Sequence, residues 1–248
     1  MKLNKIEPKF ILKANPRIGL ITLGSDFRIE KDFNNLVYGK SIDLYVNRIH
    51  CYNPLTNETL AKMADDITDV TKDILPDQKI DCVAYGCTSG TVAAGYEMIK
   101  SKINLAKPDA KVTTPITSTI KALKKLGIKR ISIFTPYTKT INDSIVSYFK
   151  KENIIINSLT YFDIASDLDI GKVDENYLFE VLSKINLEDS DALFVSCTAL
   201  PALSIIDKLE KKMNKVILSS NQTLIWDALN LIGNKEPVVG YGKIFEVN

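Results

Sequence analysis

The feature that most constrains the fold is a pattern that occurs twice, an apolar run of strand length that ends abruptly in Cys-Thr. The first copy spans 81–90 (DCVAYGCTSG) and carries Cys87, and the second spans 191–200 (DALFVSCTAL) and carries Cys197. Each run predicts a buried strand with a thiol at its carboxyl end. In open α/β sheets, this is the end at which ligands bind.

The repetition extends upstream of the two cysteines. Residues 16–23 (PRIGLITL) are similar to residues 129–136 (KRISIFTP). Arg17 precedes Arg130 by 113 residues, and Cys87 precedes Cys197 by 110. A duplicated half, with one thiol in each copy, is the simplest explanation of these matching offsets.

Segments of strand and helix character alternate along both halves. In the first half we predict strands at 17–23, 42–50, 81–86 and 111–115, and helices at 28–36, 56–74, 91–103 and 116–126. In the second half we predict strands at 130–135, 154–160, 191–196 and 216–218, and helices at 139–152, 174–186, 200–213 and 223–231. Strands joined through helices require crossovers, so both sheets should be mostly parallel.

The expected architecture is therefore α/β, with two pseudo-symmetric lobes, each a mostly parallel sheet flanked by helices. We assign 1–115 to the first lobe, completed by 219–248, and 116–218 to the second lobe. Two similar lobes that face each other bring their strand ends together. We accordingly expect the active site in the cleft between the lobes.

Composition excludes several classes of protein. The chain has 248 residues, of which 45% are hydrophobic and 25% charged, which is enough for one large unit or two modest lobes. Its 32 basic residues are scattered and nearly balance 30 acidic ones, so we expect no nucleic-acid partner. No apolar run has the length of a signal peptide or a membrane span, so we expect no membrane partner. Four cysteines without a secretory signal favour reduced thiols in the cytoplasm.

The paired thiols suggest a chemistry. Each of Cys87 and Cys197 stands just before a predicted helix, whose free amides and positive end favour a thiolate. The residues that follow them, Thr88 and Ser89 in one copy and Thr198 and Ala199 in the other, offer amides that hold a carboxylate. Two such turns suit a small dicarboxylate or an amino acid held between two sulfurs. The alternative is that buried cysteines act as small hydrophobic residues, which fits Cys82 and Cys51 better.

Other cysteine chemistries lack their components. The chain has no Cys-x-x-Cys motif, and His50 is its single histidine, so we expect neither a zinc site nor a thioredoxin-type redox motif. It also has no Walker A loop and no Gly-x-Gly-x-x-Gly motif at a strand-to-helix turn. We therefore expect no metal and no cofactor.

Taken together, the duplicated lobes and four short motifs resemble the aspartate/glutamate racemase superfamily. The motifs are 86–91 (GCTSGT), 196–200 (SCTAL), 135–137 (TPY) and 219–222 (SSNQ). Within the superfamily the chain is most similar to the branch of maleate cis-trans isomerases and arylmalonate decarboxylases, which includes ectoine-utilisation proteins of that type. The similarity runs from about Arg17 to Gly242.

The resemblance implies roles for individual residues. In the maleate isomerases, the cysteine matching Cys87 attacks the double bond and forms a succinyl-type adduct, whereas the cysteine matching Cys197 handles the proton. Tyr137 matches a tyrosine that binds a substrate carboxylate. In the racemases, the paired thiols instead work on opposite faces of one carbon. The decarboxylases have only the second-lobe cysteine, so the presence of Cys87 favours isomerisation or racemisation.

The chain departs from the maleate isomerase pattern at two acidic positions. Those enzymes carry asparagines where this chain has Asp26, beside Ser25 in the loop after the first strand, and near Asp167. A carboxylate next to a dianionic substrate is repelled unless the acid is protonated or the substrate carries a cation. Asp26 is thus expected to pair with an ammonium group or to orient Cys87, or else to cap the following helix. Asn221 is expected to line the cleft or to tie its own turn.

Three functional hypotheses follow from the sequence. The first is a cofactor-independent isomerase or racemase that uses two thiols on a small carboxylate or an amino-acid-derived substrate. The second is a decarboxylase with Cys197 as the proton donor. The third is a ligand-binding protein without turnover, since a fold alone does not establish function. Assembly into a homo-oligomer is compatible with all three.

Overall fold

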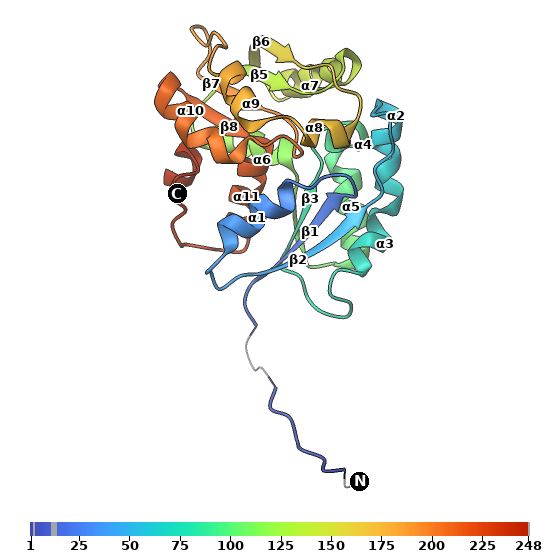
Figure 1. Cartoon of the computed structure of the whole chain (residues 1–248). Helices are drawn as coiled ribbons and strands as arrows, with labels where there is room; N and C mark the ends of the chain where they lie inside the picture. The colour runs from blue at the N-terminus through green and yellow to red at the C-terminus, as the bar shows by residue number, and fades with distance from the viewer. Residues whose placement is uncertain (2, 11–13, 248) are drawn as a thin grey trace.

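The computed structural model describes residues 1, 3–10 and 14–247. Within these residues the chain forms two four-stranded sheets, with strand orders β2-β1-β3-β4 and β6-β5-β7-β8. All neighbouring strands in both sheets run parallel. Helices flank the two sheets, which lie one above the other in Figure 1. The predicted α/β class with two similar parallel sheets is confirmed.

The elements follow the alternation that the sequence predicts. The strands are β1 (Arg17–Leu23), β2 (Asp43–Ile49), β3 (Cys82–Gly86), β4 (Lys111–Thr113), β5 (Arg130–Thr135), β6 (Ile155–Tyr161), β7 (Ala192–Val195) and β8 (Val216–Ser219). The α-helices are α1 (Ile29–Val37), α2 (Asn57–Lys62), α3 (Ile67–Lys72), α4 (Thr88–Ala94), α5 (Tyr96–Ala106), α6 (Pro115–Lys125), α7 (Lys139–Lys151), α8 (Asp167–Gly171), α9 (Glu175–Leu182), α10 (Ile206–Met213) and α11 (Ser220–Leu231). The 3-10 helices are η1 (Met63–Asp66), η2 (Leu203–Ile205) and η3 (Lys243–Glu246).

The two sheets position the two cysteines equivalently. β3 and β7 occupy the third place in their respective sheets, and every residue in both strands is buried. A strand with neighbours on both edges and helices on both faces is apolar throughout, as these two runs are. Cys87 follows β3 directly, and Cys197 follows β7 after one further residue. Both thiols thus lie at the carboxyl ends of corresponding strands.

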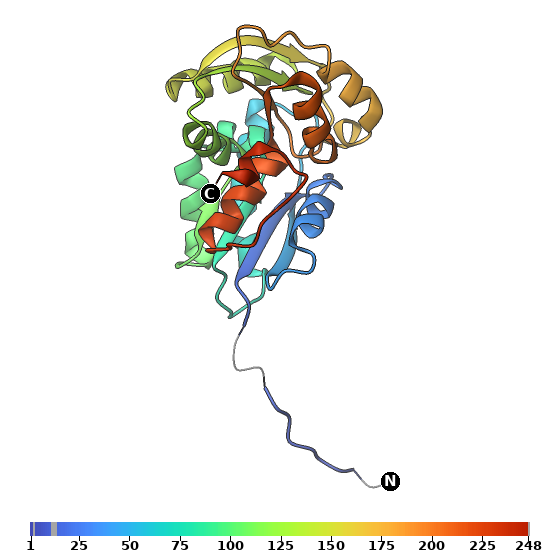
Figure 2. The same ribbon diagram turned by 90° about the vertical axis from the view of Figure 1, so that its left-hand side faces the viewer.

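The C-terminal helix α11 links the two halves of the molecule. It follows β8 of the second sheet, yet it packs on β3, β4 and α1 of the first half and along α6. Figure 2 shows it running through the middle of the molecule. A capping box between Ser219 and Gln222 begins the helix, and its apolar face, including Leu224 and Ile225, packs with Ile18 and Phe33. These contacts place α11 against the first sheet, whereas η3 also contacts β8 of the second.

Several predicted helices have different boundaries in the structure. The helix expected at 56–74 is divided by η1, and the one expected at 91–103 begins at Thr88 and is interrupted at Gly95, whose φ is +87°. The helix expected at 200–213 does not begin at its predicted start, because residues 198–201 form bends before η2 and α10. The predicted C-terminal helix starts three residues early, and α8 was not predicted.

The two-lobe division of the chain remains a proposal. The sheets separate between β4 and β5, near the predicted boundary at 115. Residues 2, 11–13 and 248, which the predicted lobe ranges include, lie outside the described residues. Among the residues that are described, no helix is both long and apolar enough to cross a membrane.

Gly86, which precedes Cys87, leads to a prediction about stability. A Cβ at this position would lie 2.8 Å from Ile29 Cδ1 and 3.2 Å from the carbonyl oxygen of Ile21. We expect Gly86→Ala to lower the free energy of unfolding by about 1–3 kcal/mol, because the backbone of β1 cannot move without disturbing the sheet. Denaturant titration measures the change.

The matched control is Gly24→Ala at the end of β1. A Cβ there meets only the carbonyl oxygen of Ile49, at an ordinary 3.5 Å. This variant should stay within about 0.5 kcal/mol of the wild type. Equal stability of the two variants would contradict the close packing of β3 against β1.

Candidate active site

Cys87 is held at the start of α4 with its sulfur facing backbone amides. It occupies the N-cap position in an extended conformation, and its Sγ accepts a hydrogen bond from the Gly90 N–H at 3.2 Å. The hydroxyl of Ser89 lies 4.0 Å from the same sulfur. Position 90 is a glycine because a Cβ there would lie 2.8 Å from the sulfur. The side chain of Cys87 is buried.

Cys197 has a different backbone setting. Its φ is +99°, a conformation that favours glycine and is strained for a residue with a side chain. Its N–H donates to Ser220 Oγ at 3.0 Å. Because the following residues form bends rather than a helix, the prediction that Cys197 stands at a helix N-terminus is wrong. The strained backbone at Cys197, and not a helix N-terminus, determines the position of its buried thiol.

Direct hydrogen bonds join the two cysteine turns. Ser220 Oγ, which accepts from the Cys197 N–H, is also 2.8 Å from Thr88 Oγ1. In addition, Thr198 Oγ1 donates to the carbonyl oxygen of Gly86 at 3.3 Å. Gly86, before Cys87, thus contacts Thr198 directly, and Thr88, after Cys87, is joined to the Cys197 N–H through Ser220. The structure brings the two predicted catalytic cysteines into one buried site.

Tyr137 belongs to the same site. It follows β5 at the carboxyl end of the second sheet and is fully buried. Burial, followed by the nearby thiols of Cys197 and Cys87, raises the pKa of its hydroxyl. That hydroxyl also interacts with the Cys197 thiol. The predicted substrate-binding tyrosine thus lies beside both sulfurs and remains protonated at neutral pH.

Two buried carboxyl groups complete the site. Asp167, at the start of α8, accepts a hydrogen bond from Ser25 Oγ at 2.5 Å. Asp26 Oδ1 accepts from the N–H groups of Arg28 and Ile29 at 2.7 and 3.1 Å, whereas its Oδ2 is buried without a partner. Asp26 therefore binds the N–H groups of Arg28, the N-cap of α1, and of Ile29, its first residue, which is close to the capping role among the sequence-based alternatives.

Burial dominates the protonation of the two thiols. It raises the pKa of both, and the negative charge of Asp167 raises them further. The Gly90 N–H acts in the opposite direction on Cys87, but less strongly than burial. The sequence-based expectation of ready thiolates is thus wrong for the ligand-free site. Burial also raises the pKa of Asp167 to about 6.

Asn221 is held between the two lobes. Its Nδ2 donates to the carbonyl oxygen of Thr198 at 2.9 Å and to Asp32 Oδ2 at 2.7 Å. Its Oδ1 is buried and has no partner. Desolvation raises the pKa of Asp32 to about 7, and the nearby Asp26 adds to the effect. Asn221 therefore ties the turn after Cys197 to α1 rather than only its own turn.

Three residues at the site were not identified as site residues from the sequence: Cys51, Ser220 and Asp32. Cys51 is a third thiol near the site: burial raises its pKa, the charge of Asp167 adds to this, and its interaction with Ser25 acts in the opposite direction. Its position just after β2 at the carboxyl edge of a parallel sheet is the signal that identifies it. Ser220 and Asp32 gave no such signal, because one lies in a helix start and the other on an amphipathic helix.

Loops of the first lobe contact α8 of the second lobe next to the site. Arg28 donates through Nε and Nη2 to the carbonyl oxygen of Gly171, at 3.0 and 2.8 Å. The Leu55 N–H donates to the carbonyl oxygen of Ala165 at 2.9 Å. Together with the bond from Ser25 to Asp167, these contacts enclose the buried groups. Arg48 does not join them: it pairs with Glu30 and donates to backbone oxygens.

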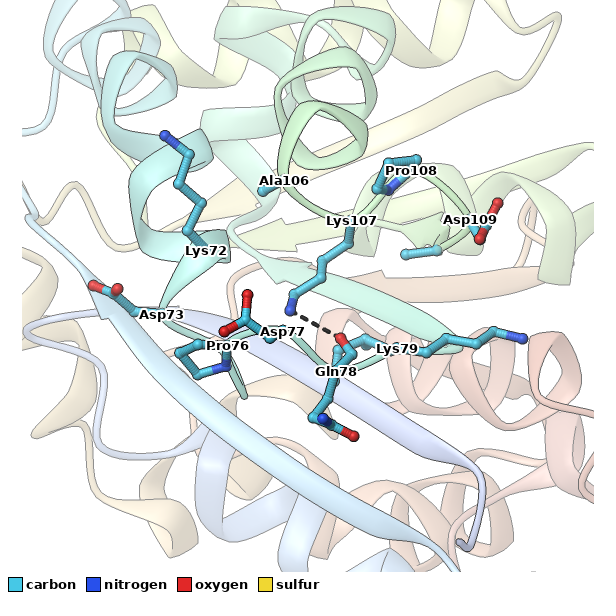
Figure 3. A pocket seen from close by; sticks show the side chains of 12 residues that line it. Lys72, Asp73, Pro76, Asp77, Gln78, Lys79, Ala106, Lys107, Pro108 and Asp109 are labelled. Atoms are coloured by element: carbon cyan, nitrogen blue, oxygen red, sulfur yellow. Dashed lines mark hydrogen bonds between the residues drawn. The ribbon is translucent and has the colours of Figure 1, made fainter. Parts of the chain in front are cut away.

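A separate cavity of about 510 Å³ lies near the amino ends of β3 and β4. Figure 3 shows it lined by Lys72, Gln78 and Lys107. Lys107 Nζ already donates to the carbonyl oxygens of Leu75 and Gln78, both at 3.0 Å. This cavity is at the opposite end of the strands from Cys87. Across the described part of the chain, no group of three His, Cys, Asp or Glu side chains is arranged to hold a metal ion.

Comparisons with known proteins agree with this geometry. The sequence model of the family described as arylmalonate decarboxylase matches residues 38–245. The chain is 25% identical to a maleate isomerase of Geobacillus stearothermophilus over 244 residues, which cover 92% of this chain and 96% of that protein.

Solved structures give the same result. One is a mutant of the Nocardia farcinica maleate cis-trans isomerase with a covalently bound succinylcysteine intermediate; it matches with a TM-score of 0.86 at 19% identity, covering 94% of this chain and 99% of that one. Another is the maleate isomerase Iso of Pseudomonas putida S16, with a TM-score of 0.84 at 22% identity and coverage of 93% and 98%. These matches confirm the resemblance and the fold that the sequence predicts.

Asp32 leads to a prediction about pH and stability. Burial raises its pKa from the ordinary 3.8 to about 7, so between these pH values the folded state binds a proton that the unfolded chain does not. Its contribution to stability is complete below about pH 4 and is lost as pH rises towards 7. The free energy of unfolding of the wild type should therefore fall between pH 5 and pH 8. In Asp32→Asn this fall should be smaller by about 1–3 kcal/mol.

The control is Asp69→Asn, on the exposed face of α3. Ion pairing with Lys72 lowers the pKa of Asp69, so that it is ionised in both states over this range. Its removal should leave the slope of stability against pH unchanged. An unchanged slope in Asp32→Asn as well would contradict the burial of a titrating carboxyl group beside Asn221.

Proposed function

The chain belongs to the arylmalonate decarboxylase family, and we propose that it is a cofactor-independent isomerase that acts on a small carboxylate with Cys87 and Cys197. The observation that carries this proposal is that the hydroxyl of Ser220 bonds to both cysteine turns, at Thr88 and at the Cys197 N–H. A decarboxylase that needs one proton donor has no use for a second thiol in that position. Two thiols in one site suit chemistry that must reach two sides of a molecule.

The geometry fits a reversible addition to a double bond. In that reaction Cys87, as a thiolate, forms a C–S bond with one alkene carbon, and the π electrons move to the neighbouring carbon, where its carboxylate stabilises them. Cys197 delivers a proton to that carbon. After rotation about the resulting single bond, the proton returns to Cys197 and the C–S bond breaks. No net proton or electron is gained or lost.

Racemisation uses the same two groups differently. One sulfur, as a thiolate, removes the α-proton, and the other, as a thiol, returns a proton on the opposite face. Both reactions need one thiolate and one thiol in the same site. The Gly90 N–H and the Ser89 hydroxyl lie beside Cys87, which makes it the better thiolate of the pair. Burial raises the pKa of the Cys197 thiol, and the hydroxyl of Tyr137 acts in the opposite direction, but less strongly.

The neighbouring residues have binding and positioning roles in this proposal. Tyr137 donates its hydroxyl to a substrate carboxylate, and the amides of Ser89 and Ala199 face the same group. Thr88, Thr198 and Asn221 hold the two turns together through their own hydrogen bonds. Ser25 fixes Asp167 at the edge of the site. The chemistry requires neither a metal nor an organic cofactor.

Decarboxylation is the second candidate function, favoured by the description of the matching family. In that reaction Cys197 alone protonates the enediolate left after loss of carbon dioxide. The maleate isomerases that match nearly the whole chain favour the first candidate. We further propose a cytoplasmic protein, because all four of its cysteines are free thiols, and leave assembly into a homo-oligomer as a companion proposal.

Activity in deuterated water tests the proposal. We expect turnover of maleate to fumarate, or α-deuteration with loss of chirality for an amino acid such as aspartate or glutamate, followed by NMR. Cys87→Ala should abolish the reaction, and Cys197→Ala should slow it by about 10²–10⁴-fold, because each removes a group that handles a bond or a proton.

The matched control is Cys82→Ala, which removes a buried thiol from the first position of β3, five residues before Cys87. It should retain turnover close to that of the wild type. Retention of full activity in Cys87→Ala would refute the two-thiol reaction. Consumption of an arylmalonate that depends only on Cys197 would establish the decarboxylase instead.

A further inference from the structure

Asp26 is a buried acid whose hydrogen bonding is half complete. Only 1% of its surface is exposed. Its Oδ1 receives two backbone N–H groups, whereas its Oδ2 is buried and receives none. A buried oxygen that lacks a donor destabilises the protein, and a bound molecule with a donor at this place removes that cost.

The protein's own donors near Asp26 are engaged elsewhere. The Thr198 hydroxyl interacts with the Asp26 carboxyl, but its single hydrogen also serves the carbonyl oxygen of Gly86 at 3.3 Å. Arg48 gives its guanidinium to Glu30 and to backbone oxygens, and Arg28 gives its guanidinium to Gly171. Among the described residues, neither Asp26 nor Asp167 takes part in an ion pair.

The site therefore has an excess of acidic groups around the thiols. Asp26 and Asp167 act electrostatically on each other and on Cys197. Burial raises the pKa of both carboxyl groups, and the charge of Arg48 offsets only a small part of this effect at Asp26. The charged and titratable groups that face Asp26 are Arg28, Arg48, Asp32, Cys51, Asp167 and Cys197. A dicarboxylate dianion adds two further negative charges to this environment, whereas an ammonium group offsets one.

We propose that Asp26 determines specificity by binding an ammonium group of the substrate through its free Oδ2, so that the site takes an amino-acid-type carboxylate rather than a simple dicarboxylate. This inference rests on the proposed function, because it assigns the substrate class of that site. Asp167, fixed by Ser25, is the second carboxyl group available to the ammonium. The carboxylate end of the substrate then points towards Tyr137, the donor between the two thiols.

A rival account keeps Asp26 protonated, with its Oδ2–H donated to a substrate carboxylate. The two accounts differ in what an amide at position 26 does. Asparagine retains the acceptor for the Arg28 and Ile29 N–H groups and supplies a neutral donor in place of Oδ2. Ammonium recognition would then be lost, whereas donation to a carboxylate would be preserved.

Equilibrium binding to matched ligand pairs tests the inference. The pairs are succinate with aspartate, glutarate with glutamate and propionate with alanine, both enantiomers of each amino acid being measured by calorimetry on the whole protein. We expect at least one amino acid to bind about 10–100-fold more tightly than its partner without the ammonium group, as charge-assisted hydrogen bonds allow. Asp26→Asn should remove this preference while preserving or improving binding of the partner.

The control variant Asp69→Asn makes the same chemical change on the exposed face of α3 and should leave the preference intact. The inference is overturned if no pair favours the amino acid, if Asp26→Asn keeps the preference, or if it weakens both members of a pair equally. Thermal unfolding of ligand-free Asp26→Asn should occur at or above the wild-type temperature, which separates lost recognition from lost folding.

The binding experiment tests the role of Asp26 and the turnover experiment tests the isomerase, and each can fail without the other. If the amino acid is preferred in an Asp26-dependent manner but no exchange in deuterated water occurs, the specificity of the site stands and the isomerase does not. If maleate is isomerised and the ammonium group adds nothing to affinity, the isomerase stands and the role of Asp26 is refuted.

Discussion

The hydroxyl of Ser220 is the contact on which the site depends. It accepts the N–H of Cys197 from one sheet and pairs with Thr88, the neighbour of Cys87, from the other. Ser220 can reach both turns because α11 leaves β8 of the second sheet and packs on the first. The fold thereby places two strand ends against each other, and the bonds of Ser220 join them together with those of Thr198 and Asn221.

Enclosure of the site determines its electrostatics. Burial holds protons on Cys87 and Cys197 in the ligand-free protein, although a backbone amide faces the first sulfur. It also leaves carboxyl groups with raised pKa values around them, Asp167 at about 6 and Asp32 at about 7. Formation of a thiolate in the proposed reaction therefore has to overcome the cost of burying its charge.

The sequence predicts the strands and the pair of cysteines well, because buried parallel strands are continuous apolar runs whose ends are sharp. Helix boundaries are less accurate: the start of α4 and the bends after Cys197 depend on capping and on tertiary hydrogen bonds that leave no periodic signal. Burial of the thiols, which reverses the expected thiolate, depends on loops far apart in sequence. Ser25, Asp26 and Asp167 were predicted site residues, but the bond that joins Ser25 to Asp167 across 142 residues could not be read from spacing.

The central claim is that Cys87 and Cys197 act on the same small carboxylate. A crystal structure with a bound substrate analogue measures this most directly, through the distances from each sulfur to the ligand carbons. We predict both sulfurs within about 3.5 Å of the same carbon or of two bonded carbons, on opposite sides of the ligand. A ligand that contacts only one sulfur, or that binds outside the turns joined by Ser220, would contradict it.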